Sequence, residues 1–463
     1  MIHHPQTTRI TMKEISALLA AFLASAAFAT DWHVSLASGS NKNDGSKEAP
    51  LKNLWKALEN AADGDTIRVA EGTYPGKMKQ NWFRIDKAVS IIGGYSADFS
   101  ERDPLVHRTL FQGLNENNDK KSGAQGVLHI EFDPARPAPQ NVDMVFDGLL
   151  FDDGFANSYH ETKGKPEGFE TGMWLEGPAY NKDRDKFPSA NRYLVYSATQ
   201  NRATGKLTFR NCAFVNAGNI AFNVSWYQGE VKVENCVFCN NRMIAANVMC
   251  SKAIPKDGPS RPRAGWKPEV EWDFENNTVL FTWSRLNDLA DMGFGVRSNE
   301  GVETDVEDCI IGLNVLTGFD NTKGSGAFKK TSINENVFFL NRDSDIQMTV
   351  SPSIARVRVE DFEDLEGTDG IESIEENVAL ADPTVFSGRI DPKYLDSFLS
   401  MKYSETTKLD PAACNGLRQV LGLPQQGTIT TSCDMFCNRY PLDMALKLFG
   451  AMPGKGAQIP AAR

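Results

Sequence analysis

Acidic, amide and guanidinium side chains recur at one point of several sequence repeats, just after a phenylalanine. This point is occupied by Asp152-Asp153, by Asn216 and, one repeat later, by Asn240. Arg242 follows Asn240 in the sequence, and Arg285 lies in a later repeat. Carboxylate and amide oxygens bind Ca²⁺, and an arginine neutralises a carboxylate of a ligand. The pattern predicts a row that could hold a cation and an acidic ligand, with the catalytic candidates Asp153, Arg242 and Arg285. The alternative is a set of tight turns, which Asn and Asp favour for backbone reasons.

Tryptophan residues lie within or beside the stretches that interrupt the repeats. The binding candidates are Trp174, Trp226 and Trp266, because an exposed indole can stack on the face of a sugar ring. For each of them, packing in the core is the alternative. His160 in a polar stretch and His129 in a strand-like stretch are acid–base candidates, with a structural role as the alternative. The sequence contains no nucleophile elbow, HExxH motif or glycine-rich phosphate loop.

Two adjacent segments set the pattern that must position these side chains. Lys206–Val224 and Glu230–Val248 align with an offset of 24 residues and are identical at eight of 19 positions, among them Cys212 and Cys236. A fixed period of roughly 20–50 residues is the signature of a solenoid. Both segments contain short alternating hydrophobic stretches, and neither has the period of about 3.6 residues that marks helical repeats. The repeat therefore predicts a parallel β-helix in which equivalent residues of successive coils stack.

The eight cysteines fall into two groups. Cys212, Cys236 and Cys309 share one repeat position, which predicts a buried ladder of reduced thiols. A bridge involving the C-terminal part is expected, but the pairing stays open among Cys239, Cys250, Cys414, Cys433 and Cys437. The spacing of Cys433 and Cys437 lacks the further ligands that a zinc site needs.

The N-terminal part of the pattern predicts a helical cap followed by the first coils. Pro50–Ala62 has the pattern of an amphipathic helix, and a strand is predicted at Thr66–Ala70. Such a helix would cover the open end of the core. Coils recur to about residue 385, with insertions near 155–205 and 250–268 that are expected to build a binding surface. The C-terminal part is predicted to contain helices at Pro392–Leu399, Pro411–Leu421 and Pro441–Phe449.

The beginning of the chain has the features of a secretory leader. Lys13 precedes an apolar stretch at Ile15–Ala26, and Ala27–Ala29 form a small-residue cleavage site. The alternative is a membrane anchor, but the apolar stretch is shorter than the roughly 20 residues of a span. With Met12 as the expected start, we divide the chain into a leader (1–29), a capped β-helix (30–385) and a cysteine-containing helical tail (386–463). The mature chain is expected to be exported and to have no membrane span.

Several short motifs resemble those of a known superfamily. Asp44–Ser46, Gly64–Ile67 and Gly72–Tyr74 are similar to the N-terminal cap of secreted right-handed parallel β-helix proteins of the pectin-lyase-like superfamily, and Ile91–Tyr95 is similar to the next coil. The resemblance implies an all-β solenoid with an N-terminal helical cap and a short helical tail, and a polysaccharide or cell-surface glycan as partner. Lyases of this superfamily hold a uronate with Ca²⁺, Arg or Lys, and its inverting hydrolases use clustered Asp residues. No segment of this chain matches their catalytic signatures.

Charge narrows the choice of partner. The formal net charge of −11 argues against nucleic acid, because no basic surface is available to neutralise phosphates. Ca²⁺ is the cofactor that the acidic and amide side chains suggest. The observations predict an exported carbohydrate-active protein, with a polysaccharide lyase-like enzyme on acidic glycans, or a glycoside hydrolase, as the enzymatic hypothesis. A non-catalytic glycan-binding protein and a structural cell-envelope protein are the alternatives.

Overall fold

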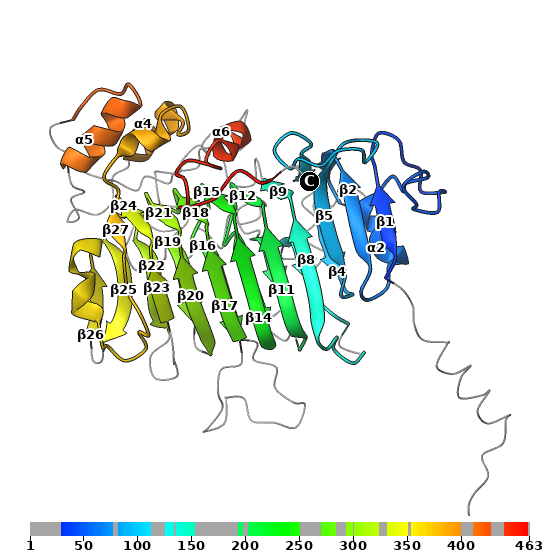
Figure 1. Cartoon of the computed structure of the whole chain (residues 1–463), viewed down its shortest axis with the longest axis horizontal. Helices are drawn as coiled ribbons and strands as arrows, with labels where there is room; N and C mark the ends of the chain where they lie inside the picture. The colour runs from blue at the N-terminus through cyan, green and yellow to red at the C-terminus, as the bar shows by residue number, and fades with distance from the viewer. Residues whose placement is uncertain are drawn as a thin grey trace, which may run out of the picture.

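The computed structural model describes residues 29–76, 82–112, 126–133, 136–152, 193–197, 202–250, 270–283, 293–299, 301–323, 331–350, 353–399, 411–426 and 439–461. Figure 1 shows the molecule as an elongated stack of coils. Several predictions of the sequence fall outside these ranges, namely residues 1–28 of the leader, most of both insertions, Asp153, His160, Trp174, Trp266, Arg285, Cys433 and Cys437.

Within the described ranges, three parallel sheets of nine strands each run along the stack. Sheet 1 consists of β1 (Asp31–Val34), β2 (Thr66–Ala70), β5 (Ser90–Tyr95), β8 (Val142–Asp147), β11 (Thr204–Arg210), β14 (Gln228–Glu234), β17 (Val270–Glu275), β20 (Val302–Glu307) and β23 (Thr331–Asn334). Sheet 2 consists of β3 (Gly72–Tyr74), β6 (Thr109–Phe111), β9 (Leu149–Asp152), β12 (Ala213–Val215), β15 (Val237–Cys239), β18 (Thr278–Leu280), β21 (Ile310–Gly312), β24 (Val337–Phe339) and β27 (Val378–Ala379). Sheet 3 consists of β4 (Phe83–Ile85), β7 (Gly126–Ile130), β10 (Tyr193–Ser197), β13 (Phe222–Trp226), β16 (Ile244–Cys250), β19 (Phe294–Asn299), β22 (Thr317–Lys323), β25 (Ser344–Val350) and the antiparallel edge strand β26 (Ser353–Val357).

Alternating side chains explain why the coils close around a core. In β11, Leu207 and Phe209 point inward and are fully buried, whereas Lys206 points outward and is partly exposed. Each inward residue stacks on its equivalent one coil away, as Leu207 does on Val231. The Phe151 and Phe214 rings stack with centroids 5.2 Å apart. The molecule is thus the parallel β-helix that the repeat predicted, in the right-handed form that the resemblance implied.

The corner after sheet 1 confirms the predicted ladders. Asn211 and Asn235 adopt positive φ angles of 54° and 55°, and Nδ2 of Asn235 donates to Oδ1 of Asn211 at 2.6 Å. The next residues, Cys212 and Cys236, are fully buried free thiols, and Cys309 shares this state. Burial raises the pKa of the Cys236 thiol, which keeps it protonated and inert.

The cap helix is shorter than predicted. Helix α2 spans Leu54–Asn60 and buries Leu54, Ala57 and Leu58 against the first coil. Leu51 lies before the helix, because its backbone pairs with the first strand: its N–H donates to the His33 carbonyl at 2.8 Å. The helix still covers the end of the core, as expected.

The C-terminal part forms short helices that lie along the outer side of sheet 2 (Figure 1). After the 3₁₀ helices η5 (Val359–Leu365) and η6 (Pro383–Phe386) come α4 (Pro392–Leu399), α5 (Pro411–Val420) and α6 (Leu442–Leu446). The Phe281 ring packs between Tyr394 and Phe398 of α4, at centroid distances of 4.9 and 5.0 Å. The tail therefore packs against the side of the cylinder. None of the helices in the described ranges has the length and apolarity needed to cross a membrane.

Candidate functional site

The predicted row of Asp and Asn side chains forms at the corner between sheets 2 and 3. Nδ2 of Asn216 donates to Oδ1 of Asp152 at 2.8 Å, and Nδ2 of Asn240 donates to Oδ1 of Asn216 at 2.7 Å. Both asparagines have positive φ, 61° and 56°, so they are turn residues as well as members of a ladder. The sequence left open whether these residues form tight turns or a row of stacked side chains, and in the structure they do both.

The C-terminal tail covers this row. The Tyr440 backbone N–H donates to Oδ1 of Asn216 at 2.8 Å, and its carbonyl accepts from Nδ2 at 3.0 Å. The Tyr394 hydroxyl donates to Oδ1 of Asn240. Asp152, Asn216 and Asn240 are fully buried. This row of Asp and Asn side chains therefore binds the C-terminal tail. Its polar atoms are not exposed on the surface, where a cation and an acidic ligand could bind.

Two predicted site residues lie in the interior, which corrects their expected outward positions. Arg242 is 2% exposed; its guanidinium lies 5.6 Å from the centre of the Trp283 ring, and Nη1 donates to the Gly218 carbonyl at 3.2 Å. Trp226 is fully buried, and its Nε1 donates to the Gly205 carbonyl at 3.0 Å. The alternation of β13 directs Trp226 inward, so core packing, the alternative role, is the one it has. Asp153, Arg285, Trp174 and Trp266 lie outside the described residues and stay predictions.

A different row of polar residues follows the outer face of sheet 3, and we call it the polar row. Strand alternation places its members opposite core residues such as Val224 and Phe319. Successive members are partners in the parallel register of β7, β10, β13, β16, β19, β22 and β25. The row consists of His129, Tyr196, Asn223, Asn247, Arg297, Asp320 and Gln347.

The polar row is enclosed although it lies on an outer face. Tyr196 is partly buried, and the other six side chains are between 0% and 6% exposed. Nδ2 of Asn247 donates to Oδ1 of Asn223 at 2.6 Å, and Nε2 of Gln347 donates to Oδ1 of Asp320 at 2.8 Å. Enclosed polar groups normally have partners, and most members of this row find them in the neighbouring coil.

Four buried side-chain atoms of the polar row have no hydrogen-bond partner in the part of the chain that the structure describes. Nε of Arg297 and Oδ2 of Asp320 form an ion pair with each other at 2.7 Å, which leaves two atoms. They are Nε2 of His129, at one end of the row, and Oε1 of Gln347, at the other. A buried polar atom without a partner is costly, and a bound ligand is one way in which such an atom becomes satisfied. These two atoms are the unmet hydrogen-bonding capacity of the polar row.

Burial shifts the pKa values of three members of the row. The His129 and Tyr196 rings meet edge to face with centroids 5.1 Å apart. Burial lowers the pKa of His129 and raises that of Tyr196, so the imidazole is neutral and the phenol protonated at neutral pH. Burial also lowers the pKa of Arg297, an effect that Asp320 opposes through its charge.

The outer face of sheet 1 is acidic. Three adjacent strands place carboxylates in register, with Asp273 between Lys232 on one side and Asp305 on the other. Burial and the charges of neighbouring carboxylates raise the pKa of Asp273 to about 6 and also raise that of Asp305. In the part of the chain that the structure describes, no group of three His, Cys, Asp or Glu side chains is arranged to hold a metal ion.

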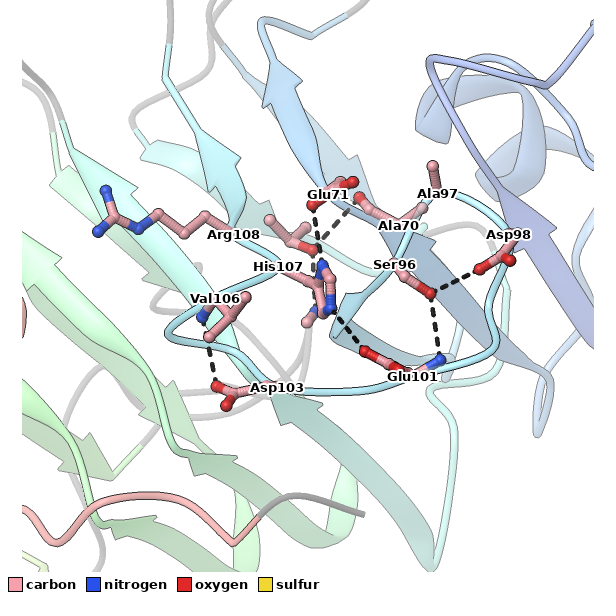
Figure 2. A network of polar contacts seen from close by, with 12 residues as sticks. Ala70, Glu71, Ser96, Ala97, Asp98, Glu101, Asp103, Val106, His107 and Arg108 are labelled. Atoms are coloured by element: carbon pink, nitrogen blue, oxygen red, sulfur yellow. Dashed lines mark hydrogen bonds and ion pairs between the residues drawn. The ribbon is translucent and has the colours of Figure 1, made fainter.

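A third polar cluster joins the loop after β5 to the first coil (Figure 2). His107 lies between two carboxylates: its Nδ1 is 2.9 Å from Oε2 of Glu71, and its Nε2 is 3.7 Å from Oε2 of Glu101. The hydrogen bond to Glu71 raises the pKa of His107. Ser96 and Asp98 close the same loop by a hydrogen bond of 2.8 Å. The cluster fastens a loop, and Asp98 and Glu101 are its exposed members.

The sequence contained a signal for the polar row. Asn223 and Asn247 are identical positions of the two aligned repeats, and each is flanked by apolar residues that point inward. Such a polar residue must face outward. The identity of Asn223 and Asn247 indicated the repeat. Their outward direction also predicts that equivalent side chains of successive coils form a row on one face of the sheet.

Comparison with protein families places a match at the N-terminal end. A family described as a protein of unknown function (DUF1565) matches residues 37–101, which contain α2 and β2 to β5. No curated protein matches the sequence.

Solved structures of three carbohydrate-related proteins are similar to this chain. Pectate lyase Pel9A shares 14% identity over 81% of this chain and 86% of that chain, with a TM-score of 0.33. A GH136 lacto-N-biosidase from Eubacterium ramulus shares 12% identity over 79% of this chain and 70% of that chain, with a TM-score of 0.27. XylC in complex with xylose shares 10% identity over 80% of both chains, with a TM-score of 0.24. These values carry no information on activity. The three parallel sheets, the coil-by-coil register and the capped first coil identify the fold of the chain as a right-handed parallel β-helix.

Proposed function

We propose that this is an exported carbohydrate-active protein that binds an extended polysaccharide along the polar row of sheet 3. The observation that carries the proposal is a row of enclosed polar side chains, one per coil, on the outer face of a continuous sheet. At about 4.8 Å between strands, the seven members extend over about 29 Å. A repeating row of this length matches a ligand that is itself a repeating chain.

The chemistry of the row suits hydroxyl groups. Asn223 and Asn247 supply amides, Tyr196 supplies a phenol, and the unpartnered Nε2 of His129 supplies one further site for a hydrogen bond. In an enclosed environment such bonds are stronger than in water. The charge of Arg297 is already compensated by Asp320 at 2.7 Å, so the row has little net charge to offer a polyanion such as nucleic acid.

One observation favours a second function, cleavage of a uronate-containing glycan by β-elimination. His129 is held neutral beside the protonated phenol of Tyr196, which gives a base and an acid on neighbouring strands. The imidazole would take the C5 proton of the uronate, a C4–C5 double bond would form as the C4–O bond breaks, and the phenol would protonate the departing oxygen. The atoms and electrons balance without a redox partner. Ca²⁺ would assist by neutralising the uronate carboxylate, as the sequence suggested.

The test is affinity electrophoresis of the mature protein in gels containing neutral or uronate polysaccharides, with and without Ca²⁺. The double variant Asn223→Ala/Asn247→Ala is expected to lose at least about ten-fold in affinity for the retained polymer. Glu271→Gln, an exposed change on sheet 1, is the matched control and is expected to leave binding unchanged. Equal binding by the two variants, or no binding by folded wild-type protein, rules out the polar row as the glycan site.

Catalysis is followed in the same samples by the absorbance of unsaturated products. Wild-type protein would release them from a uronate polymer, and His129→Gln would abolish the release while polymer retention persists. Binding without unsaturated products eliminates the lyase and leaves a glycan-binding protein. New reducing ends without unsaturation would instead indicate hydrolysis.

A further inference from the structure

A separate cavity lies at the N-terminal end of the solenoid, between α2 and β4, and we call it the cap pocket. Its volume is about 390 Å³, and its apolar walls are Trp55 and Leu58 of α2 with Trp82 and Phe83 at the start of β4. Small-molecule sites occupy roughly 300–1,000 Å³, so this cavity suits a small ligand. Neither tryptophan belongs to the binding residues expected from the sequence.

The indole rings of Trp55 and Trp82 give the cap pocket apolar faces of the kind that pack against sugar rings. Trp55 and Trp82 are each partly buried, so each retains some surface for a ligand. The apolar face of a sugar ring packs against an indole, while its hydroxyl groups need hydrogen-bond partners. Nε1 of Trp82 is buried and has no hydrogen-bond partner among the residues that the structure describes. A ligand hydroxyl oxygen that reaches this atom would accept a hydrogen bond that otherwise stays unmade at a cost.

The charged residues around the pocket select against ionised ligands. Two acids, Glu59 and Asp86, balance two bases, Arg84 and Lys87. The bases are already engaged: Nζ of Lys87 donates to the Leu58 and Glu59 carbonyls at 3.0 Å each, and Arg84 pairs at 3.5 Å with Glu131, the residue after β7. Glu59 in turn pairs with Lys56 at 3.5 Å, so a uronate would meet two carboxylates beside cations that already have partners. The hydroxyl groups of a neutral sugar can instead donate to these carboxylates.

The cap pocket adjoins the polar row through one residue. Arg84 lines the pocket, and in the register of β4 and β7 it is the partner of His129, the first member of the row. A chain bound along the row would therefore reach the pocket with its end. We infer that the cap pocket is a subsite for a neutral terminal sugar of the glycan; its assignment to the chain end rests on the function proposed above.

Isothermal titration calorimetry on the mature full-length protein tests this inference. The probes are cellotetraose and xylotetraose as neutral oligosaccharides, and tetragalacturonate as the anionic comparison. Trp82→Ala is expected to weaken binding of a neutral probe at least ten-fold. Trp82→Phe, which keeps a ring but removes the N–H group, is expected to weaken it several-fold and guards against a folding defect. Tyr227→Ala, a change of an aromatic residue that is 39% exposed elsewhere, is the matched control and should bind normally.

The outcomes separate this inference from the proposed function. Loss of oligosaccharide binding in the Trp82 variants, with retention in Asn223→Ala/Asn247→Ala, supports the cap pocket. Wild-type protein that binds neither neutral probe overturns the inference, as does preference for tetragalacturonate or normal binding by both Trp82 variants. If the oligosaccharide is bound through Trp82 but no polymer is retained in gels, the pocket is a sugar site and the function of the row is refuted.

Discussion

Arg297 of β19 and Asp320 of β22 form an ion pair across neighbouring strands on the outer face of sheet 3. Nε of Arg297 is 2.7 Å from Oδ2 of Asp320, and the two residues are 6% and 0% exposed. Nε2 of Gln347 donates to the other carboxylate oxygen at 2.8 Å. Removing two charges from water is costly, and their attraction offsets this cost only when both remain in place. The pair therefore makes the polar row electrically balanced at its most enclosed point.

Breaking this pair is expected to destabilise the protein strongly. Asp320→Ala leaves the Arg297 guanidinium buried without its counter-charge, and the free energy of unfolding should fall by about 3–5 kcal/mol. The double variant Arg297→Met/Asp320→Leu buries no charge and should lose much less. Urea denaturation of the wild type, Asp320→Ala, the single variants Arg297→Met and Asp320→Leu, and the double variant measures the difference. Additive effects of the single variants would show that the two residues do not interact.

The contact between His107 and Glu71 predicts a pH-dependent contribution to stability. The hydrogen bond raises the pKa of His107 above its ordinary value of 6.5, so the folded protein binds this proton more tightly than the unfolded chain. The stabilisation is present below the unfolded pKa and disappears as pH rises through the folded pKa. His107→Gln should therefore lower the melting temperature more at about pH 5.5 than at about pH 8.5. Because Glu71 is 43% exposed, the effect should stay below about 1 kcal/mol.

Thermal unfolding at the two pH values provides the measurement, and Glu101→Gln is the control. The Glu101 side chain is 78% exposed and lies 3.7 Å from the ring, so its removal should alter the profile less. A His107→Gln defect that is the same at both pH values would contradict a charged contact.

Most of the fold could be predicted from the repeat, because each coil buries the side chains at the same repeat positions. The 24-residue offset between Cys212 and Cys236 predicted the stacking, and the buried thiols and the Asn211–Asn235 hydrogen bond confirm it. Helix α4 begins and ends at the predicted residues, since Pro392 marks its first turn. Helix α2 differs because Leu51 pairs with β1, a contact between distant residues that a helical pattern does not reveal.

The site was less predictable because direction and cover depend on the whole fold. The spacing of Asn216 and Asn240 correctly indicated a row, but nothing in the nearby sequence indicates that the backbone of Tyr440, 224 residues after Asn216, covers it. The inward orientation of Trp226 follows from the alternation of side chains in β13, and the period-two pattern of the sequence could have predicted it. The cap pocket joins α2 to β4, and no motif marks two residues that only the closing of the first coil brings together.

The contact of Asn216 with Tyr440 predicts how firmly the tail is held. Asn216→Gly keeps the positive φ of 61° accessible but removes the side chain that both accepts from and donates to the Tyr440 backbone. The tail should lose about 1–3 kcal/mol of local stability. Hydrogen exchange at Leu442–Leu446 should become faster, whereas Asn141→Gly, an exposed position with φ of 52°, should leave it unchanged. Unchanged exchange in both variants would mean that apolar packing alone holds the tail.

The position of Asp273 in the acidic face of sheet 1 predicts a site where removing a charge stabilises the protein. Burial, and then the charges of Glu230 and Glu275, raise its pKa to about 6, while Lys232 opposes the shift. The folded protein therefore binds a proton more tightly than the unfolded chain, whose Asp titrates near the ordinary value of about 3.9. Stability falls as pH rises from about 4 to 6, and the full cost of the charge is present at neutral pH.

Asp273→Asn should remove this cost. At pH 7 the free energy of unfolding is expected to rise by about 1 kcal/mol, a value reduced from the full shift because the side chain is partly exposed to solvent. At about pH 4 the gain should vanish, because the wild-type carboxyl is then protonated in the folded state. Urea denaturation at both pH values measures the difference, with Glu271→Gln, an exposed neighbour on β17, as the control. A gain of equal size at both pH values would assign the effect to packing, since like charges in register are destabilising only while they are ionised.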